Sequence, residues 1–267
     1  MSPPTAAEAL AAWARRVREN REQVERFREV ADADFYEPLA PTFRDDPRRR
    51  DEPALEALRA LVRPGDVVLD IGAGAGRYAL PLALVAREVI TLDPSPAMLA
   101  QLRDAQGEAG IANVTVLEGR WPDVDPLPAA DVALIANVGH DVEDIGRFLD
   151  AAERAARRVC VAVMLELPPP YAVDALWPEI HGEARVALPA LPELLELLRA
   201  RSREPEVRLV GHAPSHAPDP DRTLARARRL LWVRPDGEKD RRLVALLRAG
   251  AGRADREPRL GIVTWRP

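Results

Sequence analysis

Two aspartates that each close an apolar run are the residues best suited to bind a ligand. Val67-Val68-Leu69 leads into Asp70, and Val89-Ile90-Thr91-Leu92 leads into Asp93. Because glycine tolerates a positive φ and has no side chain, a glycine turn lets the backbone touch a ligand. A carboxylate at the end of the second strand suits the two hydroxyls of a ribose. The pattern indicates an adenosine-containing cofactor, with glycines at three alternate positions after the first aspartate: Gly72, Gly74 and Gly76.

The residue at position 77 separates two kinds of cofactor. A dinucleotide-binding turn reads Gly-x-Gly-x-x-Gly, and its last glycine allows a helix to pack closely on a strand. Here that position is Arg77, and the chain reads Asp-x-Gly-x-Gly-x-Gly from Asp70 onward. This pattern resembles motif I of class I S-adenosylmethionine (SAM)-dependent methyltransferases, and residues 93–99, DPSPAML, resemble their next motif. A dinucleotide enzyme and a purely structural glycine turn stay open as alternatives.

The resemblance implies a cofactor, SAM, with S-adenosylhomocysteine as its product. It places Asp70 near the ammonium group of SAM, Gly72 and Gly74 along the methionine part, and Asp93 on the ribose hydroxyls. The predicted cofactor-binding residues are Asp70, Gly72, Ala73, Gly74, Asp93, Pro94, Gly119, Arg120, Trp121 and Asn137.

The predicted adenine contact departs from the family pattern. Many members have an acid after the glycine that follows the third strand, whereas this chain has Gly119-Arg120-Trp121. An arginine side chain has no hydrogen-bond acceptor to offer the adenine amino group. The backbone then has to make that contact. Two interpretations of Trp121 stay open, since it either covers the base or packs inside the protein.

His140 is the predicted catalytic residue, because it follows the fourth strand, where the family often places a residue near the transferred methyl group. It would orient substrate, bind the methionine carboxylate or remove a proton. Methyl transfer does not always need a base, since in-line proximity supplies much of the rate. Alternatively, His140 and Asp141 cap the next helix. The predicted substrate-binding residues are Tyr36, Glu166, Tyr171 and His181.

Charge and composition disfavour several kinds of binding partner. The chain has 267 residues and a net charge of −5, which disfavours a nucleic-acid partner. Its single cysteine, Cys160, lies in an apolar run and cannot form an internal disulfide. No apolar run has membrane-spanning length and the N-terminus lacks a secretory pattern, so we expect a cytoplasmic protein without a membrane partner. We predict no metal site, although His212 and His216 lie close in sequence. A homodimer stays open.

Alternating strand and helix patterns predict an α/β fold: a doubly wound, mostly parallel, seven-stranded Rossmann-like sheet. We expect a helical extension or lid over residues 1–54 and the methyltransferase-like domain over 55–267. Prolines at 38 and 41 should break any helix there. The predicted strands are 66–71, 88–92, 113–118, 131–136, 158–165, 206–211 and 259–265, and the predicted helices are 7–30 (one or two), 53–61, 76–85, 95–109, 142–156 and 191–202.

The segment between the last two predicted strands is unusually long. In this family those strands normally form a hairpin, yet here residues 212–258 separate them. Helical patterns at 222–231 and 239–248 predict a helical insertion, at 212–256, over the acceptor side of the sheet. A solvated basic helix is the other interpretation.

The resemblance implies SAM-dependent methyl transfer, and we expect a small-molecule acceptor. Enzymes that methylate amino groups of nucleic acids often carry Asn/Asp-Pro-Pro-aromatic after the fourth strand, whereas this chain has Asn137-Val138-Gly139-His140. Methylation of a protein or an RNA, and a non-catalytic SAM- or S-adenosylhomocysteine-binding protein, remain alternatives.

Overall fold

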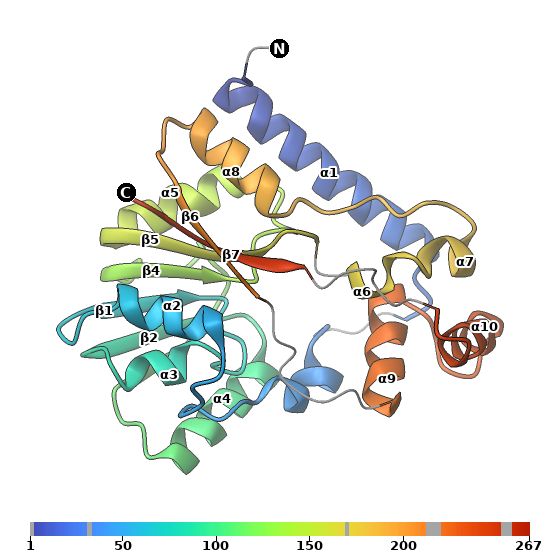
Figure 1. Ribbon diagram of the computed structural model, residues 1–267, viewed down its shortest axis with the longest axis horizontal. Helices are drawn as coiled ribbons and strands as arrows, with labels where there is room; N and C mark the ends of the chain where they lie inside the picture. Colours follow the sequence, from blue (N-terminus) through green and yellow to red (C-terminus); the bar gives the residue numbers. More distant parts are fainter. Residues whose placement is uncertain (1–2, 31–33, 169–170, 212–219, 252–257) are drawn as a thin grey trace.

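One seven-stranded sheet forms the centre of the molecule (Figure 1). The computed structural model describes residues 3–30, 34–168, 171–211, 220–251 and 258–267. The strand order is β3-β2-β1-β4-β5-β7-β6, and only β7 runs antiparallel to its neighbours. This confirms the predicted doubly wound, mostly parallel sheet. The strands are β1 Val67–Ile71, β2 Glu88–Asp93, β3 Val114–Glu118, β4 Ala130–Ala136, β5 Ala156–Leu165, β6 Glu206–Gly211 and β7 Arg259–Trp265.

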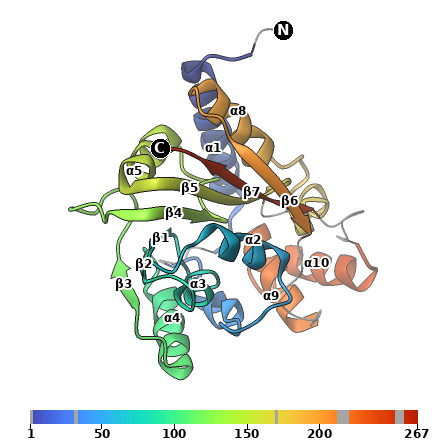
Figure 2. The same ribbon diagram turned by 60° about the vertical axis from the view of Figure 1, so that its left-hand side comes forward.

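Helices cover both faces of the sheet (Figure 2). Every residue of β1 is buried, as expected for a central strand of a parallel sheet. One face packs on α2 Pro53–Leu61, α3 Ala79–Ala83 and α4 Pro96–Ala109, and the other packs on α1 Ala6–Phe27, α5 Ile145–Ala155 and α8 Leu191–Ala200. In the pairing of β1 with β2, Asp70 lies opposite Thr91 and Ile71 opposite Leu92, so both strand-closing aspartates lie at one edge.

Two predictions about helices are wrong for local backbone reasons. The helix expected at 76–85 spans only Ala79–Ala83, because Gly76 has a φ of +82° and cannot begin a helix. Prolines at 38 and 41 were expected to break any helix, yet a 3-10 helix, η1, spans Glu37–Phe43. Pro38 lies in its first turn, where no backbone N–H is needed.

A helical layer lies beyond the carboxyl ends of the parallel strands (Figure 1). We use this name for α6 Tyr171–Asp174, α7 Trp177–His181, α9 Pro220–Leu231, α10 Glu238–Arg248 and the C-terminal half of α1. Sequence periodicity missed α6 and α7, which are too short to repeat an apolar pattern. It found α9 and α10, whose buried Leu231 and Leu243 pack in one cluster with Trp177. Residues 212–219 and 252–257, including His212 and His216, lie outside the described residues.

Arginines fasten the N-terminal extension to the domain. Arg77, at the position that separates the two cofactor patterns, forms ion pairs with Asp45 (2.8 Å) and Glu52 (2.9 Å). Glu52 also accepts a hydrogen bond from the hydroxyl of Tyr78. Arg77 therefore ties residues 45–52 to the end of the glycine turn. None of the helices in the described ranges is both long and apolar enough to span a membrane.

Candidate functional site

The glycine turn after β1 is shaped by contacts that exclude larger residues. Gly72 has a φ of +74°, and a Cβ atom there would lie 2.5 Å from Cγ1 of Val138. Gly74 has a φ of +55°, and a Cβ atom there would lie 2.9 Å from the terminal methyl of Met98. The turn after β1 thus lies directly against the loop after β4 and against α4. Its close packing brings the predicted motifs to one place at the sheet edge.

Asp93 is held in place by two backbone N–H groups. Gly74 donates to its Oδ2 (2.8 Å) and Ser95 donates to its Oδ1 (2.9 Å). Gly119, after β3, donates to the backbone oxygen of Asp93 (3.1 Å). Burial raises the pKa of Asp93, the two hydrogen bonds oppose that rise, and nearby Asp34 adds to it. Each carboxylate oxygen keeps acceptor capacity for a further donor, such as a ribose hydroxyl.

Asp70 lies deeper, and one of its oxygens has no partner. The residue is 1% exposed, and Oδ1 is buried without a hydrogen bond. Burial and the charge of Asp93 raise the pKa of Asp70 to about 7, against a hydrogen bond from the backbone of Ala79. A buried carboxylate without a partner is costly. A cationic group bound beside it, such as the ammonium group of SAM, would stabilise its charged form.

His140 presents an unpaired nitrogen inside the loop after β4. Its Nε2 lies 3.0 Å from the backbone oxygen of Asn137. Because a carbonyl only accepts, Nε2 carries the hydrogen, and Nδ1 is left with a lone pair that is buried and has no partner. Burial lowers the pKa of His140, although Asp141 and the bond to Asn137 oppose this. His140 is therefore a neutral imidazole with a free acceptor.

The alternative role of His140 as a helix cap does not hold. The residue that caps α5 is Asp144, whose side chain accepts from the backbone N–H of Arg147 (3.1 Å). The loop between β4 and α5 instead folds through two left-handed residues, Asn137 with a φ of 56° and Gly139 with a φ of 97°. These conformations turn the imidazole of His140 back onto its own loop.

Residues 34–36 of the N-terminal extension lie over this edge of the sheet. Asp34 accepts a hydrogen bond from the hydroxyl of Ser95 (2.5 Å). Arg229 of α9 donates to the backbone oxygens of Phe35 (2.8 Å) and Asp34 (3.2 Å) and stacks on the ring of Phe35. Asp34 and Arg229 were not predicted from the sequence, because the contact between them joins positions almost 200 residues apart and leaves no local pattern.

Tyr36 brings a hydroxyl group to the same place. Although 43% of the side chain is exposed, burial of its hydroxyl and the carboxylates of Asp141, Asp93 and Asp34 raise its pKa to about 12. These acids belong to the loop after β4, the end of β2 and the N-terminal extension. Tyr36 thus lies within the electrostatic influence of the loop that carries His140 and of the cofactor motif that carries Asp93.

Other predicted residues have partners elsewhere. Trp121 is buried in the core and donates from its indole nitrogen to the backbone oxygen of Phe148 (3.1 Å), so it packs inside the protein. Glu166 forms an ion pair with Arg259 (2.8 Å). Tyr171 is half-buried against the core cluster beneath α2. Three more predicted residues, Pro94, Arg120 and Asn137, are exposed and directly follow or lie close after strands β2, β3 and β4.

His181 lies inside the helical layer with both ring nitrogens engaged. Nε2 lies 2.9 Å from the backbone oxygen of Leu231, and Nδ1 lies 3.3 Å from the ammonium group of Lys239. Its ring packs between Phe27 and Trp177. In this arrangement His181 joins α7 to α9 and α10.

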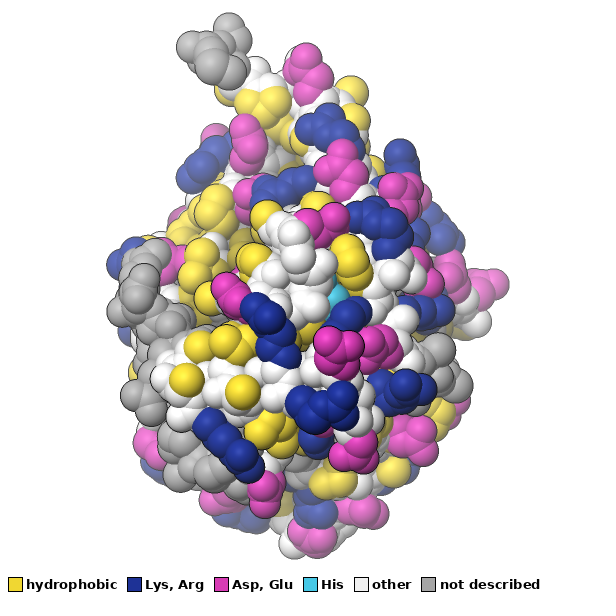
Figure 3. All heavy atoms as spheres, turned by 90° about the vertical axis from the view of Figure 1, so that its right-hand side faces the viewer, with side chains coloured by type: hydrophobic (Ala, Val, Ile, Leu, Met, Phe, Trp, Pro, Cys, Tyr) yellow, Lys and Arg dark blue, Asp and Glu magenta, His cyan; other side chains and the backbone are white. Residues whose placement is uncertain are grey.

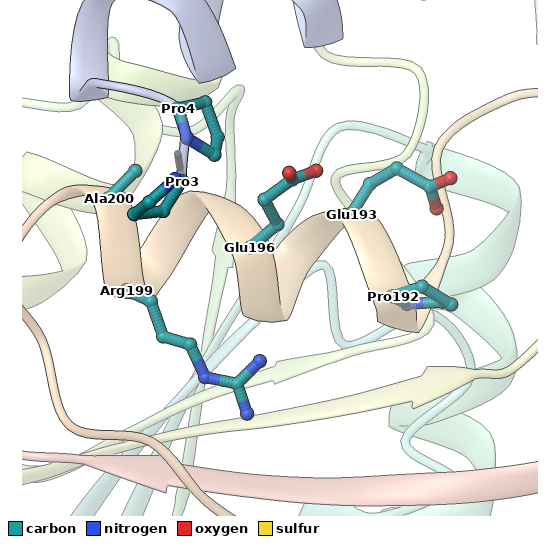
Figure 4. A pocket seen from close by; sticks show the side chains of 7 residues that line it. All are labelled: Pro3, Pro4, Pro192, Glu193, Glu196, Arg199 and Ala200. Carbon is teal, nitrogen blue, oxygen red and sulfur yellow. The ribbon is translucent and has the colours of Figure 1, made fainter. Parts of the chain in front are cut away.

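Among the described residues, neither a metal-binding cluster nor the surface hollow beside α8 belongs to this edge of the sheet. Within the described ranges, no group of three or more His, Cys, Asp or Glu side chains is placed to hold a metal ion. A surface hollow lies where Pro3 and Pro4 meet the outer face of α8 (Figure 4). It is lined by α8 side chains such as Glu196 and Arg199, and by no residue of the strand ends.

The chain resembles methyltransferases in sequence. A family model described as a methyltransferase domain matches residues 69–163. The probable cobalt-precorrin-6B C(15)-methyltransferase (decarboxylating) of Methanothermobacter thermautotrophicus is 30% identical over 114 residues, 41% of this chain and 59% of that protein. The protein-L-isoaspartate O-methyltransferase of Methanoregula boonei is 45% identical over 66 residues, 25% of this chain and 30% of that protein. The chain thus spans less than two thirds of these curated relatives.

The fold is also that of solved methyltransferases. A SAM-dependent methyltransferase from Geobacter sulfurreducens, solved in complex with S-adenosyl-L-homocysteine, matches 89% of this chain and 100% of its own. The TM-score is 0.57 and the sequence identity is 19%. At that identity the likeness is one of fold.

Proposed function

We propose that this chain, which contains a class I SAM-dependent methyltransferase domain, methylates a small-molecule acceptor. Its cofactor is SAM, whose sulfonium supplies an activated methyl group when bound. The single observation that carries the proposal is the placement of Asp70, Asp93 and the glycine turn at one edge of the sheet. The unpaired Oδ1 of Asp70 fits such a cofactor, because the ammonium group of SAM would supply its missing partner.

Different residues would hold the ribose, methionine and adenine parts of the cofactor. Asp93 would accept hydrogen bonds from the ribose hydroxyls, and Asp70 would pair with the ammonium group. Residues 72–74 would lie along the methionine part. At the adenine end we propose backbone contacts from Gly119 and Arg120, because the side chain of Trp121 is engaged in the core. Pro94 and Asn137 would border the cofactor from the rim.

His140 would act on the acceptor. Its Nδ1 lone pair can accept a hydrogen bond or a proton from an acceptor hydroxyl or amine, and its Nε2–H is fixed on Asn137. A neutral imidazole with a lowered pKa is ready to accept without first losing a proton. The hydroxyl of Tyr36, with its raised pKa, stays protonated and can donate to the acceptor from the opposite side.

A small-molecule acceptor is supported by similarity and by charge. One relative is named as a methyltransferase of cobalt-precorrin-6B, a small molecule. The outer face of the helical layer alternates basic and acidic side chains (Figure 3), which suits neither a nucleic acid nor another single-sign partner. A protein acceptor is the second candidate, because a shorter stretch resembles a protein-L-isoaspartate O-methyltransferase.

The proposal is tested by following the methyl group. Purified protein is incubated with SAM labelled in the methyl group and, in separate reactions, a low-molecular-weight cell extract, total protein or total RNA. We expect label in the low-molecular-weight reaction and its loss in His140→Ala. Label in protein or RNA instead would show that the acceptor is a macromolecule and not a small molecule. SAM binding without any labelled product would leave a non-catalytic binding protein.

A further inference from the structure

Buried polar atoms without hydrogen bonds gather in the helical layer. The described part of the chain holds eight such side-chain atoms, and four belong to Asp174, Trp177 and Arg185. Two more are the site atoms of Asp70 and His140. The other two are single nitrogens of arginines whose guanidinium groups are paired elsewhere, Arg158 and Arg201. Because buried polar groups are almost always partnered, a group of four calls for an explanation.

The group is a stacked arginine with an incomplete set of partners. The guanidinium of Arg185 lies over Trp177, 4.5 Å from the centre of its ring. Its Nη1 lies 3.5 Å from Oδ1 of Asp174, too far for a strong hydrogen bond. Only 7% of the Arg185 side chain is exposed, and Trp177 is fully buried. Burial lowers the pKa of Arg185 to about 10 and raises the pKa of Asp174.

The atoms without hydrogen bonds are mostly donors. Trp177 Nε1, Arg185 Nε and Arg185 Nη1 are N–H groups, and only Asp174 Oδ1 is an acceptor. A ligand that completes the group must therefore bring oxygen acceptors, and a positive guanidinium favours oxygens that carry negative charge. A carboxylate has both properties.

Contacts along α1 connect the segment that carries Arg185 to the loop that carries His140. The backbone oxygens on either side of Arg185 accept hydrogen bonds from α1: Ala184 from Gln23 and Val186 from Asn20. The adjacent residue of α1, Arg21, forms an ion pair with Glu143, which follows His140 by three residues. Helices α6 and α7 follow β5, whose carboxyl end closes the same edge of the sheet (Figure 1).

We infer that Arg185 and Trp177 bind a carboxylate group of the methyl acceptor. This inference rests on the proposed function and narrows its substrate class to small carboxylic acids. The carboxylate would accept from the guanidinium and from the indole nitrogen, while the reacting end of the acceptor reaches toward His140. Arg185 is here a binding residue, because it touches the substrate far from the transferred methyl group.

Acetate and benzoate serve as probes, and acetamide and benzamide as their uncharged counterparts. Calorimetric titration is done on the full chain saturated with S-adenosylhomocysteine, whose own binding is measured first. We expect saturable binding of both acids, at least tenfold stronger than binding of the amides. Arg185→Gln should weaken acid binding at least tenfold. Arg26→Gln, which removes an exposed ion pair with Glu183 on the same segment, should leave it unchanged.

A second variant guards against loss of folding. Trp177→Phe keeps the aromatic ring but removes the N–H, and it should weaken benzoate binding several-fold while S-adenosylhomocysteine still binds. The inference is overturned if neither acid binds saturably, if the amides bind as well as the acids, or if both variants bind acids normally. Water molecules alone would then provide the missing hydrogen bonds of Asp174, Trp177 and Arg185. Failure of S-adenosylhomocysteine to bind the wild type would instead count against the proposed function.

Discussion

The glycine turn and the helical layer are built in opposite ways. In the turn, short backbone contacts join the ends of adjacent strands: Asp93 accepts from Gly74 and Ser95, and Gly72 packs on Val138. In the helical layer, long arginine side chains join distant segments, such as Arg229 to Phe35. The cofactor end of the site is therefore marked by short motifs that can be read in the sequence, whereas the acceptor end is built by long side chains that leave no such motif.

The largest effect is expected where the two regions meet, at His140. His140→Ala should lower turnover roughly 10²–10⁴-fold, the usual contribution of a positioned acid or base. Affinity for SAM should change little, because the proposal assigns the unpaired Nδ1 to the acceptor and not to the cofactor. Steady-state kinetics with the identified acceptor measure the first quantity and calorimetry the second. Lost SAM binding with little change in turnover would move His140 to the cofactor end.

In the glycine turn, steric clashes should determine the effect of a substitution on stability. Gly72→Ala should lower the free energy of unfolding by about 2–4 kcal/mol, because it combines a left-handed backbone with contact at 2.5 Å to Val138. Gly107→Ala, in α4 with open space around it, is the matched control and should stabilise by about 0.5–1 kcal/mol. Denaturant unfolding measures both. Equal effects of the two substitutions would show that the turn is not constrained.

Asp70 should make cofactor affinity depend on pH. Its pKa of about 7 means that the ligand-free protein takes up a proton there as the pH falls through 7. A protonated carboxyl cannot pair with an ammonium group, so SAM affinity should fall by up to tenfold per pH unit below that point. Asp70→Asn should remove this dependence. Calorimetry measures this pH dependence between about pH 5 and pH 8. The pKa values of ordinary carboxyl groups lie below this range, and those of ammonium groups lie at or above its upper end.

The same carboxyl should affect stability with a definite sign. The folded state binds the Asp70 proton more strongly than the unfolded state, so this residue costs stability as the pH rises from 3.8 to about 7. Asp70→Asn should therefore stabilise the ligand-free protein at pH above 7 by up to about 4 kcal/mol, at about 1.4 kcal/mol per pKa unit. Denaturant unfolding of both forms measures this. A destabilised variant above neutral pH would mean that Asp70 has a partner in the ligand-free state.

The smallest effect is expected from the contact that joins the helical layer to the extension. Arg229→Met keeps an apolar stem against Phe35 but loses the hydrogen bonds to two backbone oxygens. Looser residues 34–36 should weaken S-adenosylhomocysteine binding by about 1 kcal/mol. Arg242→Met, on α10, removes an exposed ion pair with Glu179 of α7 and is the control. If the two variants bind equally, the extension does not contribute to the cofactor end.

Much of the fold could be predicted from local pattern. Apolar runs identified all seven strands to within two residues, and Gly72 and Asp93 marked the cofactor end because each directly follows or closes such a run. Trp121 shows the limit, since a tryptophan after a strand reads alike whether it covers a ligand or packs on α5. His181 lies in the helical layer and Glu166 directly follows β5, and their partners Leu231 and Arg259 come from much later in the chain.

Calorimetric titration of SAM into the wild type and into Asp93→Ala tests the cofactor end most directly. We predict that SAM binds the wild type, that NAD does not, and that Asp93→Ala weakens SAM binding by about 1–3 kcal/mol, since ribose hydroxyls lose their acceptor. Tight binding of NAD without binding of SAM, or unchanged affinity in Asp93→Ala, would contradict the assignment of Asp93 and of the glycine turn to this cofactor.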